Sequence, residues 1–417
     1  MDPITWEWLV FWEFLDMSVR WLHVIAGIAW IGSSFYFVHL DSSLKKVEGL
    51  PAGAGGEAWQ VHGGGFYHMI KYNVAPEKMP EELTWFKWEA YATWMSGFAL
   101  LVIVYYFSAE LYMIDPEVLD ISPWLAVLIS VLGVALGWLA YDLLCKSPIG
   151  DNEVLLAAVG FAFIVVLAIV YTYIFSARGA YMQMGALIGT IMAANVLMII
   201  IPNQRVVVAD LIAGREPDPK YGYIAKTRSM HNNYLTLPVL FVMISNHYPL
   251  IYASQFNWLI LALILVMGAV IRHFYNERHR GAPSPWWTWA AASVLGLLVI
   301  GLSSMQPAND VSDEADAMPE SSAMFAEVEE IVLSRCSMCH AAEPLWEGMP
   351  VPPKGVVLET PEHIRLLADD INAQSVRSHA MPPSNITDMQ PEERATLAAW
   401  IAAGTPITEA DVQASAQ

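Results

Sequence analysis

The sequence contains little cysteine and few charged residues. Only three of its 417 residues are Cys, which excludes a disulfide-rich scaffold. Cys145 stands alone near the end of an apolar run, where we expect an inert, packed thiol. Charged residues make up 15% of the chain and hydrophobic residues 56%, more apolar surface than one soluble core can bury. The expected solvent is therefore the membrane.

Basic residues are scarce as well, above all in the last quarter of the chain. The whole chain has 21 Lys and Arg against 41 Asp and Glu, and the segment from Asp310 onward has 5 against 19. A net charge of −14 on this segment excludes nucleic acid as a partner. It suits exposure to a soluble compartment and a basic redox partner.

The N-terminal residues lack the features of a cleaved secretory signal. Residues 1–16 contain no Lys or Arg, and no small-residue cleavage site follows the first apolar run. We expect the first helix to be an uncleaved anchor.

Eight apolar stretches approach the ~20 residues that a membrane-spanning helix needs. They are residues 17–38, 89–108, 122–144, 154–176, 183–202, 234–251, 257–276 and 286–306. The sixth is the weakest because Pro238 and Pro249 interrupt it, although neighbouring helices can satisfy the freed backbone groups. The predicted fold class is all-α, a polytopic bundle of about eight transmembrane helices.

The distribution of Lys and Arg predicts the orientation of this bundle. If the N-terminus is outside, the inner loops and helix ends hold fourteen basic residues and the outer loops hold only Arg178. The positive-inside rule therefore places the N-terminus outside. Eight crossings return the C-terminus to the same side.

The chain is expected to divide into a membrane domain, residues 1–306, and a small α-helical domain, residues 322–417. Residues 307–321 between them are polar and read as a linker. Helical patterns in the small domain cover Ser322–Arg335 and Pro391–Ala403. Phe325 and Trp400 are expected to pack where these helices cross.

The small domain carries the motif Cys336-Ser337-Met338-Cys339-His340. This spacing lets two thiols bond one haem while the following His ligates the iron, so it predicts a covalent haem c. A zinc site would need a second Cys/His pair, and His363 and His379 do not form one.

A haem that transfers electrons needs a second axial ligand, for which Met381 is the first candidate. It lies about forty residues after the motif and is followed by two prolines. A Met ligand raises the potential relative to a second His. Met349, Met389 and His379 are the alternatives.

Histidines in the membrane stretches fall into an outer pair and an inner group, judged at about 1.5 Å of depth per residue. His23 and His247 form the outer pair, either as ligands of a haem b or as hydrogen-bonded interhelical residues. The inner group is His39, His231 and His273.

The inner string Met230-His231-Asn232-Asn233-Tyr234 is dense in hydrogen-bonding groups. It could hold a planar polar heterocycle, or form a helix cap with an interfacial Tyr. The loop that contains Gly63-Gly64-Gly65-Phe66-Tyr67-His68 resembles a folded flap. We find no nicotinamide or flavin fingerprint.

Four strings and the haem motif together resemble the bacterial membrane-bound urate oxidases (urate hydroxylases, PuuD type) with a C-terminal cytochrome c. The strings are Arg20–Phe35, Trp85–Tyr91, His231–Pro238 and Ser245–Pro249. The resemblance covers essentially the whole chain. It implies hydroxylation of urate to 5-hydroxyisourate, with electrons leaving through the cytochrome.

The resemblance leads to one reading of the whole chain. A protein of the bacterial inner membrane, with its cytochrome domain in the periplasm, would bind urate near His231, Asn232, Asn233 and His273. Electrons would pass outward, through haem b if present, to haem c and then to a soluble cytochrome c or a terminal oxidase.

Two other functions stay open at this point. A non-enzymatic membrane cytochrome would relay electrons from quinol or a partner dehydrogenase. A porphyrinogen oxidase of the HemJ type is the third hypothesis, because the first helix has His23 and then Trp30 seven residues later, as in that family.

Overall fold

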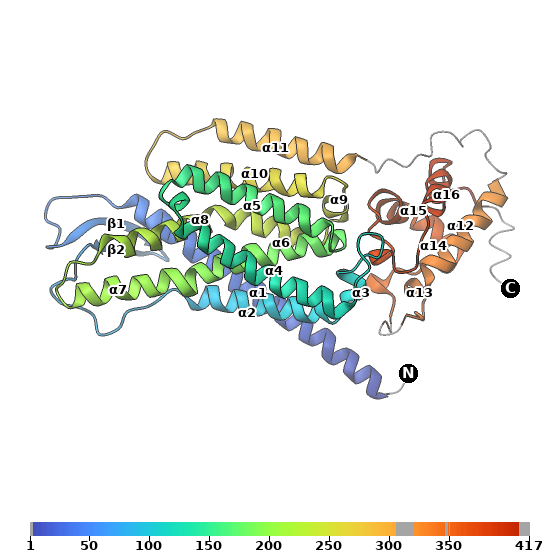
Figure 1. The fold of residues 1–417 in the computed structure, drawn as a ribbon, viewed down its shortest axis with the longest axis horizontal. Helices are drawn as coiled ribbons and strands as arrows, with labels where there is room; N and C mark the ends of the chain where they lie inside the picture. Colours follow the sequence, from blue (N-terminus) through green and yellow to red (C-terminus); the bar gives the residue numbers. More distant parts are fainter. Residues whose placement is uncertain (1–2, 306–320, 347–348, 350, 408–417) are drawn as a thin grey trace.

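A computed structural model describes the chain except residues 1–2, 306–320, 347–348, 350 and 408–417. A long helical bundle is followed by a small helical domain at one of its ends (Figure 1). Nearly all of the predicted linker, residues 307–321, lies outside the described residues.

The bundle is built from long helices, each of which overlaps one predicted apolar stretch. They are α1 (Pro3–Ser43), α2 (Trp88–Leu100) continued by η1 (Leu101–Tyr106), α4 (Pro123–Lys146), α5 (Glu153–Thr172), α6 (Ala177–Ala194) continued by η3 (Asn195–Ile200) and α7 (Ile201–Ile212), α8 (Pro219–Ser245), α10 (Asn257–His279) and α11 (Trp287–Ser304). Short helices between them are α3 (Ala109–Tyr112), η2 (Pro148–Asp151) and α9 (Pro249–Tyr252).

Six helical segments among the described residues are long and apolar enough to cross a membrane. They are Val10–Ser43, Pro123–Lys146, Glu153–Thr172, Ala177–Ile212, Asn257–His279 and Trp287–Ser304. The α-helical part of α2 is only 13 residues long, and the first half of α8 is rich in polar residues. The chain is therefore a helical protein of the membrane type, while the count of eight crossings and the orientation stay predictions.

Helix α6 lies in the centre of the bundle, and α1 and α11 lie at its surface. Leu187 and Ile188 of α6 are fully buried, whereas Trp21 of α1 and Leu297 of α11 are more than two-thirds exposed. Large apolar side chains on an outer face are stable in lipid, which is as apolar as they are.

Helices α8 and α10 approach each other closely at a proline. Pro238 lies inside α8, and a Cβ atom on Gly268 of α10 would come within 2.6 Å of the Pro238 ring. Only glycine leaves room for this crossing. The close approach brings the polar first half of α8 against the last turns of α10.

A β-hairpin in the loop after α1 is the exception to the all-α class. Strands β1 (Ala54–His62) and β2 (Gly65–Tyr72) pair antiparallel, and Gly63 and Gly64 take positive φ values of 60° and 80° in the turn. The run Gly63-Gly64-Gly65, from which a folded flap was expected, forms the turn of this hairpin and the start of β2. Alternation of side chains along the strands is weak, so the sequence pattern did not indicate them.

The small domain contains α12 (Ser321–Arg335) and α16 (Pro391–Ala402), close to the predicted bounds. Between them are α13 (Ser337–His340), η4 (Pro353–Gly355), α14 (Pro361–Leu366), α15 (Ala368–Ile371), η5 (Asn372–Arg377) and η6 (Pro383–Asn385). The rings of Phe325 and Trp400 lie 5.8 Å apart and are fully buried, which confirms their predicted packing.

The small domain contacts the bundle through the segment that follows Met381. Ser384 Oγ donates to the carbonyl oxygen of Leu111 at 3.0 Å, and Asn385 Nδ2 donates to Glu117 Oε1 at 2.6 Å. The predicted axial-ligand segment therefore lies at the seam between the two parts.

Candidate functional site

A buried ion pair joins α4 to α8. Arg228 Nη2 lies 2.7 Å from Asp142 Oδ1, and both side chains are about 95% buried. Lys146, one turn further along α4, bonds the other carboxylate oxygen at 2.6 Å. Charges inside an apolar bundle are costly unless paired, so each partner here depends on the other.

The ion pair extends into a hydrogen-bonded network through Asn195. Arg228 Nη1 donates to Asn195 Oδ1 at 3.1 Å, and Asn195 Nδ2 lies 2.9 Å from Asn232 Oδ1 and 3.1 Å from the Tyr141 hydroxyl. Asn232 donates to the Met192 carbonyl at 2.9 Å. Asn232 thus has its partners within the protein.

His231 contacts the same network from its edge. Its Nδ1 lies 2.7 Å from the hydroxyl of Tyr141, whose ring also faces the Arg228 guanidinium at 5.0 Å. The structure therefore places the predicted site residues His231 and Asn232 around a satisfied ion pair. Their catalytic role stays a prediction.

A second cluster has buried polar atoms that lack partners. Asn233 Oδ1 accepts from Arg272 Nε at 2.9 Å and from Asn276 Nδ2 at 3.0 Å. Asn233 Nδ2, Arg272 Nη2 and Asn276 Oδ1 have no partner within the part of the chain that the structure describes. All three residues are at least 97% buried. Buried polar atoms are nearly always paired, so these three mark a place where a ligand could bind.

Helical spacing explains why these side chains converge. Arg272, Asn276 and His279 stand at i, i+4 and i+7 on one face of α10. Phe35 and His39, four apart on α1, face them: the Arg272 guanidinium carbon lies 3.8 Å from the Phe35 ring centroid, and the rings of His39 and His279 are 4.6 Å apart. We call Phe35, Asn233, Arg272 and Asn276 the inner polar site.

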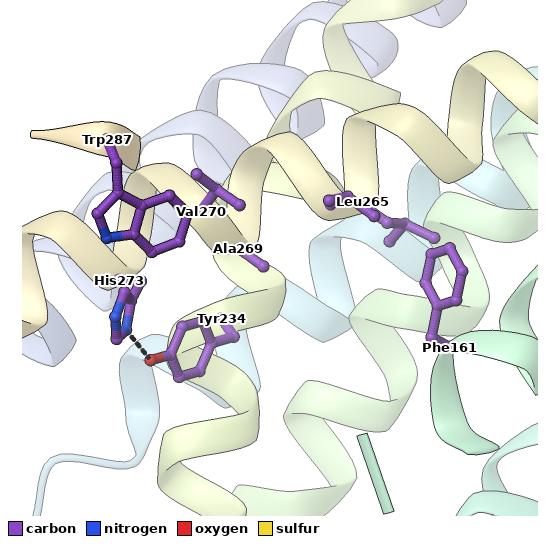
Figure 2. A pocket seen from close by; sticks show the side chains of 8 residues that line it. Phe161, Tyr234, Leu265, Ala269, Val270, His273 and Trp287 are labelled. Carbon is purple, nitrogen blue, oxygen red and sulfur yellow. Dashed lines mark hydrogen bonds between the residues drawn. The ribbon is translucent and has the colours of Figure 1, made fainter. Parts of the chain in front are cut away.

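His273 lies outside the inner polar site. It points into an apolar pocket of about 320 Å³, where Tyr234 OH lies 3.4 Å from its Nδ1 and Trp287 is nearby (Figure 2). Successive residues on a helix point about 100° apart. Asn233 and Arg272 therefore face the inner polar site, whereas the next residue of each helix, Tyr234 and His273, faces the apolar pocket. The structure does not place His273 in one site with Asn233, as the sequence had suggested.

His23 of the outer pair is anchored against α2. Its Nδ1 lies 3.0 Å from the Thr93 carbonyl oxygen and 3.1 Å from Ser96 Oγ, and a Cβ on Gly97 would come within 2.9 Å of the ring. His247 is exposed just after the end of α8. Anchoring of Nδ1 is what a haem-ligating His requires, but it equally suits an interhelical hydrogen bond. The haem b pair stays a prediction.

The haem c motif lies at the end of α12 and in α13. Cys336 and Cys339 are free thiols, and His340 Nδ1 lies 3.0 Å from the Val356 carbonyl oxygen, which leaves Nε2 available for iron. Burial raises the pKa of the Cys336 thiol to about 12 and also raises the pKa of Cys339. Two thiols, a fixed imidazole and an adjoining apolar core fit a covalent haem c.

The backbone of the Met381 segment is held at several points. The Met381 N–H donates to the Gln374 carbonyl oxygen at 2.9 Å, and the Met381 carbonyl oxygen accepts from Arg394 Nη1 at 2.9 Å. Met389, an alternative ligand, is 1% exposed and belongs to the apolar core, while His379 is exposed. The Met381 side chain is half-buried, which is compatible with Met381 as the second axial ligand. That Met381 binds the iron stays a prediction.

Sequence reasoning missed several residues of both clusters. Asp142, Asn195 and Asn276 were not considered, and Arg228 and Arg272 were counted only as inner charges. The signal was present in part, because charged residues within or beside apolar stretches are functional candidates by default.

The fold and sites define a helical membrane-type protein with a small appended helical domain that carries the Cys336-Ser337-Met338-Cys339-His340 motif. A family model described as Urate oxidase N-terminal matches residues 9–303. The chain therefore belongs to this family, which points to an oxidoreductase acting on urate. No curated protein and no solved structure matches the chain.

The buried ion pair gives a testable prediction for stability. Asp142→Leu should lower the free energy of unfolding by about 3–5 kcal/mol, because Arg228 keeps a buried, unpaired charge. The double variant Asp142→Leu/Arg228→Met should recover much of the loss. Chemical denaturation of the detergent-solubilised protein measures both.

Lys146→Gln is the matched control, because Lys146 is 59% exposed and contacts the same carboxylate. It should cost less than about 1 kcal/mol. Equal stability of Asp142→Leu and Lys146→Gln would show that the buried pair is not a structural anchor.

Proposed function

We propose that the bundle oxidises urate at the inner polar site and that the electrons pass to a haem c held by the small domain. The protein would lie in the bacterial inner membrane, with the small domain in the periplasm. Family membership, the haem motif and the unpartnered atoms of Asn233, Arg272 and Asn276 support this proposal.

The chemistry is a two-electron hydroxylation. Urate and one water give 5-hydroxyisourate, two protons and two electrons, which is the reaction that the family resemblance implies. A C–O bond forms at C5 of the purine, the water loses one proton, and a ring N–H of the purine loses the other. Because the proposed acceptor takes one electron at a time, two transfers are needed for each urate.

The unpartnered atoms of the inner polar site carry the proposal. The Arg272 guanidinium and the Asn233 amide nitrogen donate hydrogen bonds, and Asn276 Oδ1 accepts them. Urate presents carbonyl oxygens beside N–H groups on a flat ring and carries a negative charge at neutral pH. Its anion would complete these bonds and balance the charge of Arg272 where water is excluded.

Phe35 and the histidine pair have distinct supporting roles in this proposal. The ring of Phe35 covers Arg272 and gives a flat ligand an apolar surface to pack on. His279 Nδ1 is buried without a partner among the described residues, and its ring meets that of His39, which is exposed. This pair would accept the protons that the reaction releases and pass them to the inner side.

The length of α10 leaves room for an intermediate carrier between the two sites. Arg272 is fifteen residues from the start of α10, so the inner polar site lies about 22 Å of helix from the outer end. Once attached, haem c would accept single electrons and deliver them to a soluble cytochrome c or a terminal oxidase. His23, anchored on α2, is the residue that we propose for a haem b between the two, with His247 as the predicted partner.

The other two hypotheses have less support. A relay cytochrome needs no buried, unpartnered donors at the inner side, and the chain has them. A porphyrinogen oxidase of the HemJ type would need a large apolar pocket beside His23, and neither the pocket of about 320 Å³ beside His273 nor the groove of about 560 Å³ described below is lined by His23.

Arg272 provides the first test of this function. Arg272→Gln should weaken urate binding and lower kcat/KM about 10- to 100-fold, because a charge-assisted hydrogen bond is lost from a buried site. Equilibrium dialysis with urate under anaerobic conditions, together with steady-state kinetics, measures the two effects. The control is Arg278→Gln, which removes an exposed base from the same end of α10. Similar kinetics for the two variants would remove Arg272 from the site.

The small domain provides the second test. The double variant Cys336→Ser/Cys339→Ser should lose covalent haem and urate-driven reduction of an external cytochrome c. It should bind urate as the parent protein does, because the inner polar site is untouched. Unchanged reduction of the external acceptor would separate the small domain from the electron path.

A further inference from the structure

An apolar groove of about 560 Å³ lies at the outer end of the bundle, beside the small domain. Its walls come from α8, α9, α10 and α11, and include Phe241, Ile251, Met267 and Val299. The same groove is lined by Arg377, which belongs to η5 of the small domain. The groove therefore joins membrane-facing apolar side chains to a cation from outside the bundle.

The mouth of the groove is polar. Ser303 and Ser304, in the last turn of α11, line it together with Arg377. Ser303 Oγ is buried and has no partner among the residues that the structure describes. Arg377 is exposed, and among the described residues its guanidinium makes one long hydrogen bond, 3.4 Å from Nε to Asn372 Oδ1. A cation and an unpaired hydroxyl thus line the same groove, where helix α11 ends.

The position of Arg377 is unusual for its domain. From Asp310 onward the chain has 19 acidic and 5 basic residues. Arg335 is paired with Glu393, and Arg394 is buried and bonds backbone carbonyls, so neither is available to a ligand at the groove. An acidic domain is repelled by an anionic membrane surface. Arg377, as a base at the mouth of the groove, can bind the anionic headgroup of a lipid despite the acidity of its domain.

We propose that this groove binds an anionic phospholipid of the outer leaflet, with an acyl chain between α8, α10 and α11 and the phosphate on Arg377 and Ser303. Apolar walls below a basic mouth are the features by which membrane proteins hold such lipids. The lipid would connect the small domain to the bundle beside the Ser384 and Asn385 contacts. This inference does not depend on the reaction proposed for the inner polar site.

Two glycines of α11 allow a matched test of the groove. A Cβ on Gly296 would meet only Met267 Sδ, at 3.9 Å, so Gly296→Leu fills the groove without a backbone clash. Gly301 has no neighbour within 4 Å and is exposed, so Gly301→Leu adds the same side chain elsewhere on the helix. Arg377→Gln removes the cation, and Arg365→Gln removes an exposed base of the same domain as its control.

The experiment is native mass spectrometry of the full-length protein titrated with phosphatidylglycerol or phosphatidylcholine in detergent. The parent protein, Gly301→Leu and Arg365→Gln should retain phosphatidylglycerol in preference to phosphatidylcholine. Arg377→Gln should lose about tenfold in phosphatidylglycerol affinity and most of the preference, as expected for one charge-assisted contact. Gly296→Leu should retain neither lipid.

Three outcomes would overturn the proposal. In the first, the parent protein, Arg377→Gln and Gly296→Leu retain phosphatidylglycerol equally. In the second, the parent protein retains the two lipids equally. In the third, the molecule that co-purifies in the groove is a quinone. If Gly296→Leu does not fold, Arg377→Gln alone decides, because Arg377 is exposed and its replacement leaves the apolar packing intact.

Discussion

Polar atoms inside this bundle must find partners within the protein, and this constraint shapes the packing of α8. Four consecutive residues of α8 point at four neighbours: His231 at Tyr141, Asn232 at Asn195, Asn233 at Arg272 and Tyr234 at His273. So many polar side chains inside an apolar bundle are stable only because α4, η3 and α10 supply partners for them. The Pro238 and Gly268 crossing brings α10 close enough to do so.

The same constraint separates scaffold from site. Around Arg228 the polar side chains satisfy one another, so that cluster acts as an anchor. Around Arg272, one polar atom on each of three residues is left over. Leaving buried donors and acceptors unpaired costs stability, and binding sites are where proteins accept that cost. The proposed urate site is defined by this difference.

Much of the architecture followed from the sequence because the length and spacing of apolar residues are local signals. The long helices and the packing of Phe325 against Trp400 could be predicted in this way. The hairpin could not, because its strands alternate weakly and depend on Gly63 and Gly64 for their turn.

The site was only half predictable, because partners from distant helices are not visible in a string. Asn233 was proposed from its polar neighbourhood, but Arg272 and Asn276 become its partners only through the packing of α8 on α10. His273 was grouped with Asn233 because both fall near the inner ends of their apolar stretches. One residue along a helix turns the side chain by about 100°, which was enough to place it in another pocket.

The central claim is that urate delivers electrons to a haem c in the same chain. A visible difference spectrum of the purified full-length protein, recorded anaerobically before and after urate is added, tests it most directly. The account predicts reduction of the c-type bands by urate, with two electrons accepted for each urate consumed. Unchanged bands with urate, together with full reduction by a quinol, would contradict it and identify a relay cytochrome.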